Sequence, residues 1–187
     1  PLYEDSGFAY LKTHYYGGIK KYQWTTIPLA IHGVVALKDG TTVEIKIDAY
    51  IPGTYIEDEI QKIEVYKKIA AIENKDDYME IKAELEDRYS EVPDSVFNLM
   101  DIAYIKSKAK MLQIEEVKEF DKEIRFNFAK NSKHINRVYK YLLNNYKDRV
   151  FVMFGEKPYF AMRTNMIKKD NILGFYKEIL DELTKNI

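Results

Sequence analysis

The chain has 187 residues and carries 29 Lys and Arg against 30 Asp and Glu, with no cysteine. This length suits one domain with or without an appendage, and a hydrophobic content of 46% excludes a disordered chain. The lack of cysteine excludes disulfides, thiolate zinc sites and cysteine nucleophiles. Because the net charge is −1, binding of nucleic acid or of an anionic membrane would need a local basic patch.

The chain opens with Pro1 rather than Met, so we expect it to be a piece of a longer protein. Residues 1–10 include Glu4 and Asp5 and lack the basic start and apolar run of an export signal. No apolar run approaches the ~20 residues that cross a bilayer. We therefore expect a cytoplasmic, soluble domain without a membrane partner.

Residues 1–40 have the weakest pattern, since Gly17, Gly18 and Pro28 interrupt any helical period. We expect an irregular or helical lead-in segment there, followed by a domain over residues 41–187. Residues 41–50 alternate and are rich in β-branched side chains, which predicts a strand. Thr54 and Glu57 have the spacing of a capping box. We therefore predict a helix that starts there and ends near residues 73–74.

A second helix is predicted over residues 75–89, with Tyr78, Ile81, Leu85 and Tyr89 as its apolar face. A third runs from Pro93 to about residue 112. The period then changes from 3.6 to 2 and predicts hairpins over 114–130 and 150–163, with helices over 132–147 and 170–185. The fold class is therefore α+β: three helices, then a β-β-α-β-β-α half whose small mixed or antiparallel sheet is packed by helices.

The sequence offers no constellation for catalysis. It has no glycine-rich phosphate loop, and His14, His32 and His134 share no metal-ligand spacing. Its carboxylates fall mostly on the predicted solvent faces of helices. We therefore predict no catalytic residue, no metal site and no cofactor.

Two charged helix faces remain. Lys133, Arg137, Lys140 and Lys147 lie at offsets of zero, four, seven and fourteen, which predicts a basic face. Such a face could contact the phosphate backbone of nucleic acid, or it could simply be solvated, as the balanced total charge favours.

The predicted second helix carries Glu80, Glu84, Asp87 and Arg88 at offsets of zero, four, seven and eight. At 100° per residue these side chains gather opposite the apolar face. They could form a docking face that binds arginines of a partner, or they could be a solvated surface. Composition does not choose between these alternatives.

Two segments resemble the C-terminal domain of the bacterial transcription-repair coupling factor. The first has DAYIP at residues 48–52, followed by Tyr55-Ile56 and Asp58-Glu59. The second has ELEDRY at residues 84–89, followed by Pro93. The similarity extends over residues 41–187 and is strongest from 48 to 114. In two places where the family usually has glycine, this chain has Ser90 and Gln113.

The resemblance implies a regulatory domain that is not itself an enzyme. In the family, this domain docks on an N-terminal module resembling excinuclease B and masks the surface for excinuclease A. It thereby holds an ATP-driven DNA translocase autoinhibited, and contacts with DNA and RNA polymerase come through the parent protein. The family's docking residues correspond to Glu84, Asp87 and Arg88, and periodicity adds Glu80. The alternative function is a nucleic-acid-binding module that uses the basic face.

Overall fold

The computed structural model describes residues 41–165, 167 and 171–186, together with the backbone of three short strands nearer the N-terminus. These strands are β1 (Tyr15–Tyr16), β2 (Ile19–Lys20) and β3 (Val34–Ala36). The expected lead-in segment over residues 1–40 otherwise lies outside the described residues, so its predicted boundary with the following domain stays a prediction.

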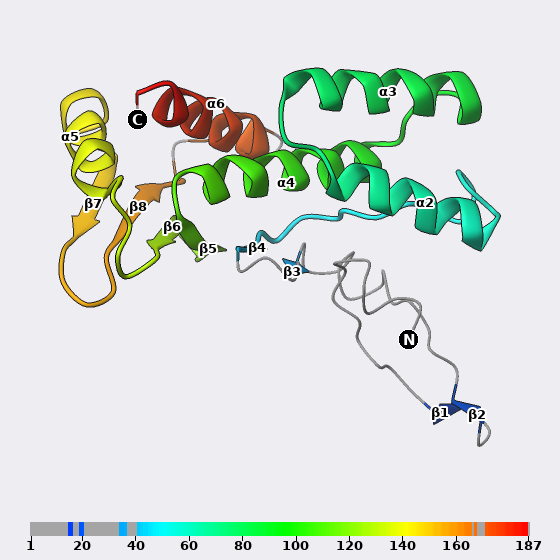
Figure 1. Ribbon diagram of the computed structural model, residues 1–187, viewed down its shortest axis with the longest axis horizontal. Helices are drawn as coiled ribbons and strands as arrows, with labels where there is room; N and C mark the ends of the chain where they lie inside the picture. Colours follow the sequence, from blue (N-terminus) through cyan, green and yellow to red (C-terminus); the bar gives the residue numbers. More distant parts are fainter. Residues whose placement is uncertain are drawn as a thin grey trace.

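The predicted order of elements is confirmed from residue 42 onward, and with it the α+β class (Figure 1). The helices are α2 (Glu59–Ala70), α3 (Lys75–Tyr89), α4 (Asp94–Met111), α5 (Ile135–Asn145) and α6 (Ile172–Lys185). The strands of this part are β4 (Thr42–Glu44), β5 (Ile114–Glu119), β6 (Glu123–Phe128), β7 (Val150–Met153) and β8 (Tyr159–Arg163).

One six-stranded sheet has the order β3-β4-β5-β6-β8-β7. Strands β4 and β5 are parallel and the other neighbours are antiparallel. The parallel pair follows from the long connection through α2, α3 and α4, since parallel strands need a crossover. Figure 1 shows α4 and α6 lying along the sheet, α2 and α3 at one end of the molecule, and α5 at the other end beside β7.

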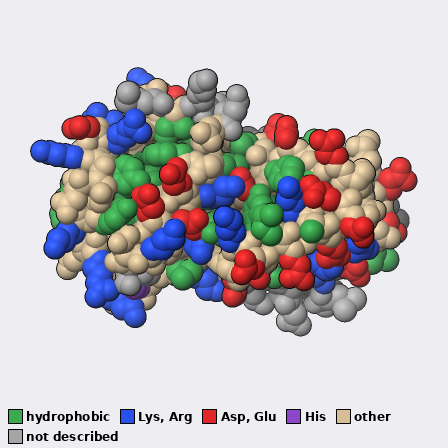
Figure 2. Space-filling model, turned by 90° about the horizontal axis from the view of Figure 1, so that it is seen from above, with side chains coloured by type: hydrophobic (Ala, Val, Ile, Leu, Met, Phe, Trp, Pro, Cys, Tyr) green, Lys and Arg blue, Asp and Glu red, His purple; other side chains and the backbone are tan. Residues whose placement is uncertain are grey.

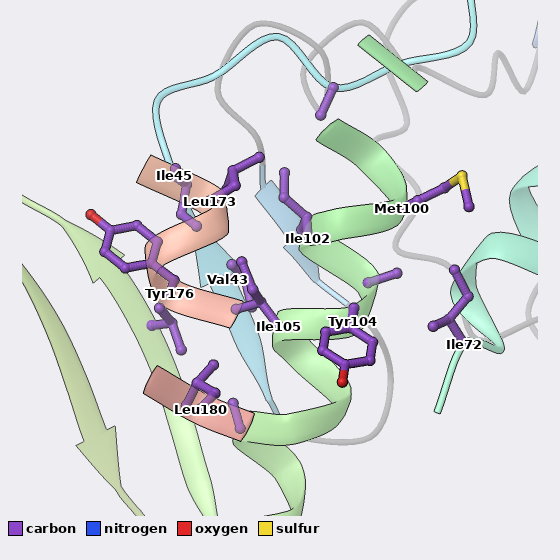
Figure 3. Packing of buried hydrophobic residues seen from close by; sticks show 14 of the residues in the cluster. Val43, Ile45, Ile72, Met100, Ile102, Tyr104, Ile105, Leu173, Tyr176 and Leu180 are labelled. Atoms are coloured by element: carbon purple, nitrogen blue, oxygen red, sulfur yellow. The ribbon is translucent and has the colours of Figure 1, made fainter. Parts of the chain in front are cut away.

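The core lies between the sheet and helices α4 and α6. Tyr176 and Leu180 of α6 and Ile105 of α4 are fully buried and gather near Val43 of β4 (Figure 3). On the sheet, the Phe126 ring of β6 stacks on the Phe160 ring of β8, with the two ring centroids 4.4 Å apart. This packing joins the two hairpins to the last helix, so the C-terminal half folds around one core.

The strand predicted over residues 41–50 is shorter than expected, because β4 ends at Glu44. Beyond that point the backbone N–H groups no longer pair with the backbone of a neighbouring strand. The Lys46 N–H donates to the Glu119 carboxylate at 2.7 Å, and the Tyr50 N–H donates to the Ser95 carbonyl at 3.1 Å. Residues 45–50 therefore run toward the start of α4 with a bend at residues 46–47, where the Ile47 N–H donates to the Ile45 carbonyl at 3.0 Å, and alternation alone does not reveal such a bend.

The predicted capping box of Thr54 and Glu57 is wrong. The first residues of that segment form a turn, in which the Ile56 N–H donates to the Pro52 carbonyl. The helix begins later, at Glu59, and Asp58 caps it by accepting from the Gln61 N–H at 2.8 Å. A stronger N-terminal signal nearer the apolar run therefore prevails over the capping-box spacing.

The predicted end of that helix near residues 73–74 is also wrong, because α2 ends at Ala70. Asn74 instead caps α3: its side chain accepts from the N–H groups of Asp76 and Asp77. The Asp77 carboxylate accepts in return from the Asn74 N–H, which completes a capping box. The predicted bounds of α3 are confirmed.

Candidate docking surface

Helices α2 and α3 lie side by side at one end of the molecule (Figure 1). Asn74 and the acidic residues after it favour the start of α3, since negative charge stabilises a helix N-terminus. The apolar face of α3 points inward as predicted, with Leu85 only 2% exposed and Tyr78, Ile81 and Tyr89 packed against the core. The opposite face of α3 is therefore turned to solvent.

The acidic face is the set of Glu80, Glu84, Asp87 and Arg88. Glu80, Asp87 and Arg88 are exposed and Glu84 is half-buried. Figure 2 shows acidic side chains gathered over the right-hand end of the molecule, where α3 lies. The helical geometry thus brings the four predicted residues onto one accessible surface.

Glu84 is the centre of an ion-pair network that joins the two helices. Its two carboxylate oxygens accept from the Lys68 ammonium of α2 at 2.6 and 2.7 Å. The Arg88 guanidinium, one turn later on α3, donates to the same carboxylate at 2.8 Å. Glu84 is therefore held in place, with its charge shared by two cations.

These contacts set the ionisation of the network. The hydrogen bond from Lys68, followed by that from Arg88, lowers the pKa of the Glu84 carboxyl. The same carboxylate raises the pKa of Arg88. Both side chains therefore stay charged at neutral pH, and they present a fixed pattern rather than a titrating one.

Glu80 and Asp87 differ from Glu84. No ion pair or hydrogen bond joins either side chain to another of the residues that the structure describes in 41–165 and 171–186. Both are exposed on the same side of α3. Their carboxylates are thus the members of the acidic face that are open to a cation on a partner.

Sequence reasoning missed the residues that support this face. Lys68 belongs to it through its pair with Glu84. The Arg88 guanidinium lies over the Tyr89 ring, 5.1 Å from its centroid, and the Tyr89 hydroxyl donates to the Gln61 side chain at 3.0 Å. Spacing along one helix carries no signal for Lys68, because its pair with Glu84 joins two different helices.

The predicted basic face is not one helix face. Because α5 spans Ile135–Asn145, it carries only Arg137 and Lys140. Lys133 precedes the N-cap residue, and Lys147 follows the C-cap residue. The turn before the helix is held by the Gln113 side chain, which accepts from the Lys133 N–H at 3.0 Å. The role of the four basic side chains as phosphate contacts stays a prediction.

A separate hollow of about 580 Å³ lies between the end of α2 and the C-terminal half of α4, and none of the predicted site residues lines it.

Within the described part of the chain, no group of three His, Asp or Glu side chains is placed to hold a metal ion. Among the described helices, none is long and apolar enough to cross a membrane.

The chain is similar to proteins of two kinds. The family model described as TRCF domain matches residues 45–138. A crystal structure of the C-terminal domain of transcription-repair coupling factor is 30% identical and superposes with a TM-score of 0.67, covering 78% of this chain and 94% of that one. The transcription-repair-coupling factor of Staphylococcus epidermidis is 40% identical over 82 residues, which are 44% of this chain and 7% of that protein.

The second similarity is shorter. A protein of Clostridium acetobutylicum named "Probable M18 family aminopeptidase 1" is 71% identical over 45 residues, which are 24% of this chain and 10% of that protein. The chain thus spans a tenth or less of the length of these curated relatives. So short a shared length transfers no activity from the aminopeptidase to this chain.

Proposed function

The chain belongs to the TRCF domain family, and on that premise we propose that it docks on the N-terminal excinuclease-B-like module of a transcription-repair coupling factor. Docked there, it covers the surface that excinuclease A would bind and holds the DNA translocase autoinhibited. Excinuclease A, RNA polymerase and DNA are then partners of the parent protein, and the domain contributes regulation without catalysis of its own.

The observation that carries this proposal is the acidic face of α3. Asp87 and Glu80 offer exposed carboxylates, while Glu84 and Arg88 are held in position by Lys68 and the Tyr89 ring. Arginine on a partner can bind such carboxylates in a bidentate manner. Because Glu84 and Arg88 are already held in position, these two side chains lose little conformational entropy on docking.

A polar surface suits a latch that has to open. Interfaces between domains of one chain are commonly modest in area and more polar than permanent ones. Charge pairs supply register, and removing one partner of a buried pair costs ~2–5 kcal/mol. A closed state favoured by only a few kcal/mol can then be released by a competing partner.

Masking can be tested by competition. The excinuclease-B-like module is bound to immobilised excinuclease A, and increasing amounts of this chain are added. We expect the chain to release the module, and Asp87→Asn to weaken that competition at least severalfold because it removes one charge at constant shape. Glu156→Gln, which removes one exposed carboxylate in the β7–β8 turn, is the matched control.

Two results would count against the proposal. One is a complex in which the chain, the module and excinuclease A are bound together, since masking forbids it. The other is equal competition by Asp87→Asn and Glu156→Gln, since the α3 surface would then have no part in docking.

A further inference from the structure

The near-zero net charge conceals a strong separation of charge along the chain. Residues 55–94, which include α2 and α3, contain thirteen Asp and Glu and six Lys and Arg. Residues 129–163, from the end of β6 through β8, contain eight Lys and Arg, with Asp148 and Glu156 as the acids. Figure 2 shows basic side chains prevailing at the left-hand end and acidic ones at the right-hand end. The α5–β8 end is thus a local basic region.

Among the residues that the structure describes, helices cover one face of the sheet in this region and not the other. Phe126 contacts Tyr176 of α6, and Phe128 contacts Tyr139 of α5. Side chains alternate along the strands, so Phe151 and Met153 of β7 point to the opposite side. They are 53% and 40% exposed. We call this second side the open face of the sheet.

Planar groups form a continuous strip across the open face. The Phe151 ring on β7 lies 6.1 Å from the Tyr159 ring on β8, its partner strand. The Arg125 guanidinium on β6 lies 5.2 Å from the Tyr159 ring and 4.4 Å from the Phe120 ring. Arg125 is held there by its hydrogen bond to Glu123 at 2.6 Å. The strip is therefore assembled before any ligand arrives.

Two further cations flank the strip. The Arg163 N–H of β8 donates to the carbonyl of Arg149, the residue just before β7, at 2.9 Å, which brings the two residues close together. Strand alternation places Arg163 on the same side as Tyr159 and Phe151, and Arg149 stands in the turn directly before β7. Both side chains are exposed. The open face therefore combines the exposed Phe151 ring and the half-buried Tyr159 ring with arginines, in a basic part of the chain.

We propose that the open face binds single-stranded nucleic acid, with Phe151 and Tyr159 stacking unpaired bases and Arg149 and Arg163 contacting phosphates. Exposed rings on a sheet stack bases because every base presents a π face. Arginines beside the rings neutralise the backbone and release its counterions. This surface differs from the predicted basic face, whose helix α5 packs on the other side of the sheet.

The strand edge argues against a second copy as the occupant. β7 is an edge strand of four residues, and the Val150 N–H already donates to the Tyr146 carbonyl at 3.0 Å. Little backbone is left for an added strand to pair with. The arginines also repel the equivalent surface of another copy.

The test is titration of a fluorescein-labelled oligothymidylate with the purified chain, followed by anisotropy. We expect binding at low salt that weakens steeply with added salt, and weaker binding of a duplex of equal length because its bases cannot stack. Phe151→Ala should lower affinity roughly tenfold, as loss of a stacked base does. Phe151→Tyr, which keeps a ring, should bind as wild type does. Ile60→Ala, which removes a side chain 71% exposed on α2, should also leave binding unchanged.

The double variant Arg149→Gln, Arg163→Gln removes two phosphate contacts and should reduce the slope of log affinity against log salt by about 1.4. Because both arginines are exposed, we expect the midpoint of thermal unfolding of this variant to stay as in wild type, and measuring it checks that the variant is folded. No binding at low salt with about 100 µM chain, the weak limit of the usual dissociation constants of non-specific complexes, would overturn the proposal. Equal affinity of Phe151→Ala and Ile60→Ala, or preference for the duplex, would overturn it as well.

Discussion

Two residues at backbone positions that favour glycine show how closely the chain follows its family. Ser90 has φ 77° and Gln113 has φ 57°, and these are the two positions where the resemblance implies glycine. At positive φ a residue with a Cβ atom is strained, whereas glycine is not, so such a residue lowers the stability of the fold. The backbone thus keeps a conformation suited to glycine while the sequence departs from it.

Ser90→Gly should therefore stabilise the fold. Ser90 follows α3 with φ 77° and ψ −159°, a region nearly restricted to glycine, and we expect a gain of about 1 kcal/mol in the free energy of unfolding. Urea denaturation measures it, with Ser90→Ala as the control. A gain with alanine as large as with glycine would show that the backbone conformation is not the cause.

The Glu84 network makes a prediction about pH. Because the pKa of Glu84 is lowered in the folded protein, its contribution is present above the ordinary carboxyl pKa and is lost as pH falls through the lowered value. The side chains are 32–46% exposed, so we expect the pairs to contribute only about 0.5 kcal/mol at neutral pH.

Glu84→Gln should therefore be less stable than wild type by that amount at neutral pH, and the difference should vanish in acid. Urea denaturation of both proteins at several pH values measures this. A difference that stays constant into strong acid would mean that the lost contacts are not ionic.

At the scale of elements, the strongly periodic segments were predictable from the sequence. The apolar face of α3 and both hairpins are confirmed, because burial on one side imposes a regular period. Helix ends were less predictable. Several residues before α2 could serve as its cap, and the choice depends on whether the preceding chain forms a turn.

The corrected start of α2 can be tested directly. Asp58→Ala removes the side chain that accepts from the Gln61 N–H, and we expect a loss of about 1 kcal/mol in the free energy of unfolding. Thr54→Ala, at the position that spacing alone favours, should change it by less than about 0.5 kcal/mol. The reverse order of the two effects would restore the capping-box prediction.

The acidic face was also predictable in part from helical periodicity. Helical spacing is enough to gather Glu80, Glu84, Asp87 and Arg88, since all four lie on one confirmed helix. It is not enough to find Lys68, which reaches Glu84 from another helix. Helical spacing also made the predicted basic face too long, because Lys133 and Lys147 lie beyond the ends of α5. Contacts between elements depend on tertiary packing, which a single period does not encode.

On the scale of the whole molecule, the two proposed surfaces lie at opposite ends. The acidic face belongs to α3, and the open face is centred on β7 and β8, beyond α4 and α6 (Figure 1). Their charges are opposite, so each attracts a different class of partner from solution. The fold thus keeps the two charged ends apart.

Separate surfaces imply that both partners bind at once. We expect the excinuclease-B-like module and an oligothymidylate to form a ternary complex with this chain, with the affinity for each changed less than about threefold by the other. Anisotropy of the labelled oligonucleotide in saturating module measures this. Displacement of the oligonucleotide by the module would mean that the surfaces overlap.

The central claim is that the acidic face of α3 docks on the excinuclease-B-like module. Isothermal titration calorimetry of this chain against that isolated module tests it, with wild type, the Glu84→Ala, Asp87→Ala double variant and Glu156→Gln. We expect binding by wild type and the control, and loss of at least about 2 kcal/mol of binding free energy in the double variant. Thermal unfolding of the double variant should change little, since Asp87 is exposed and Glu84 only half-buried. Equal binding by all three proteins would contradict the account, as would a double variant that binds weakly only because it has unfolded.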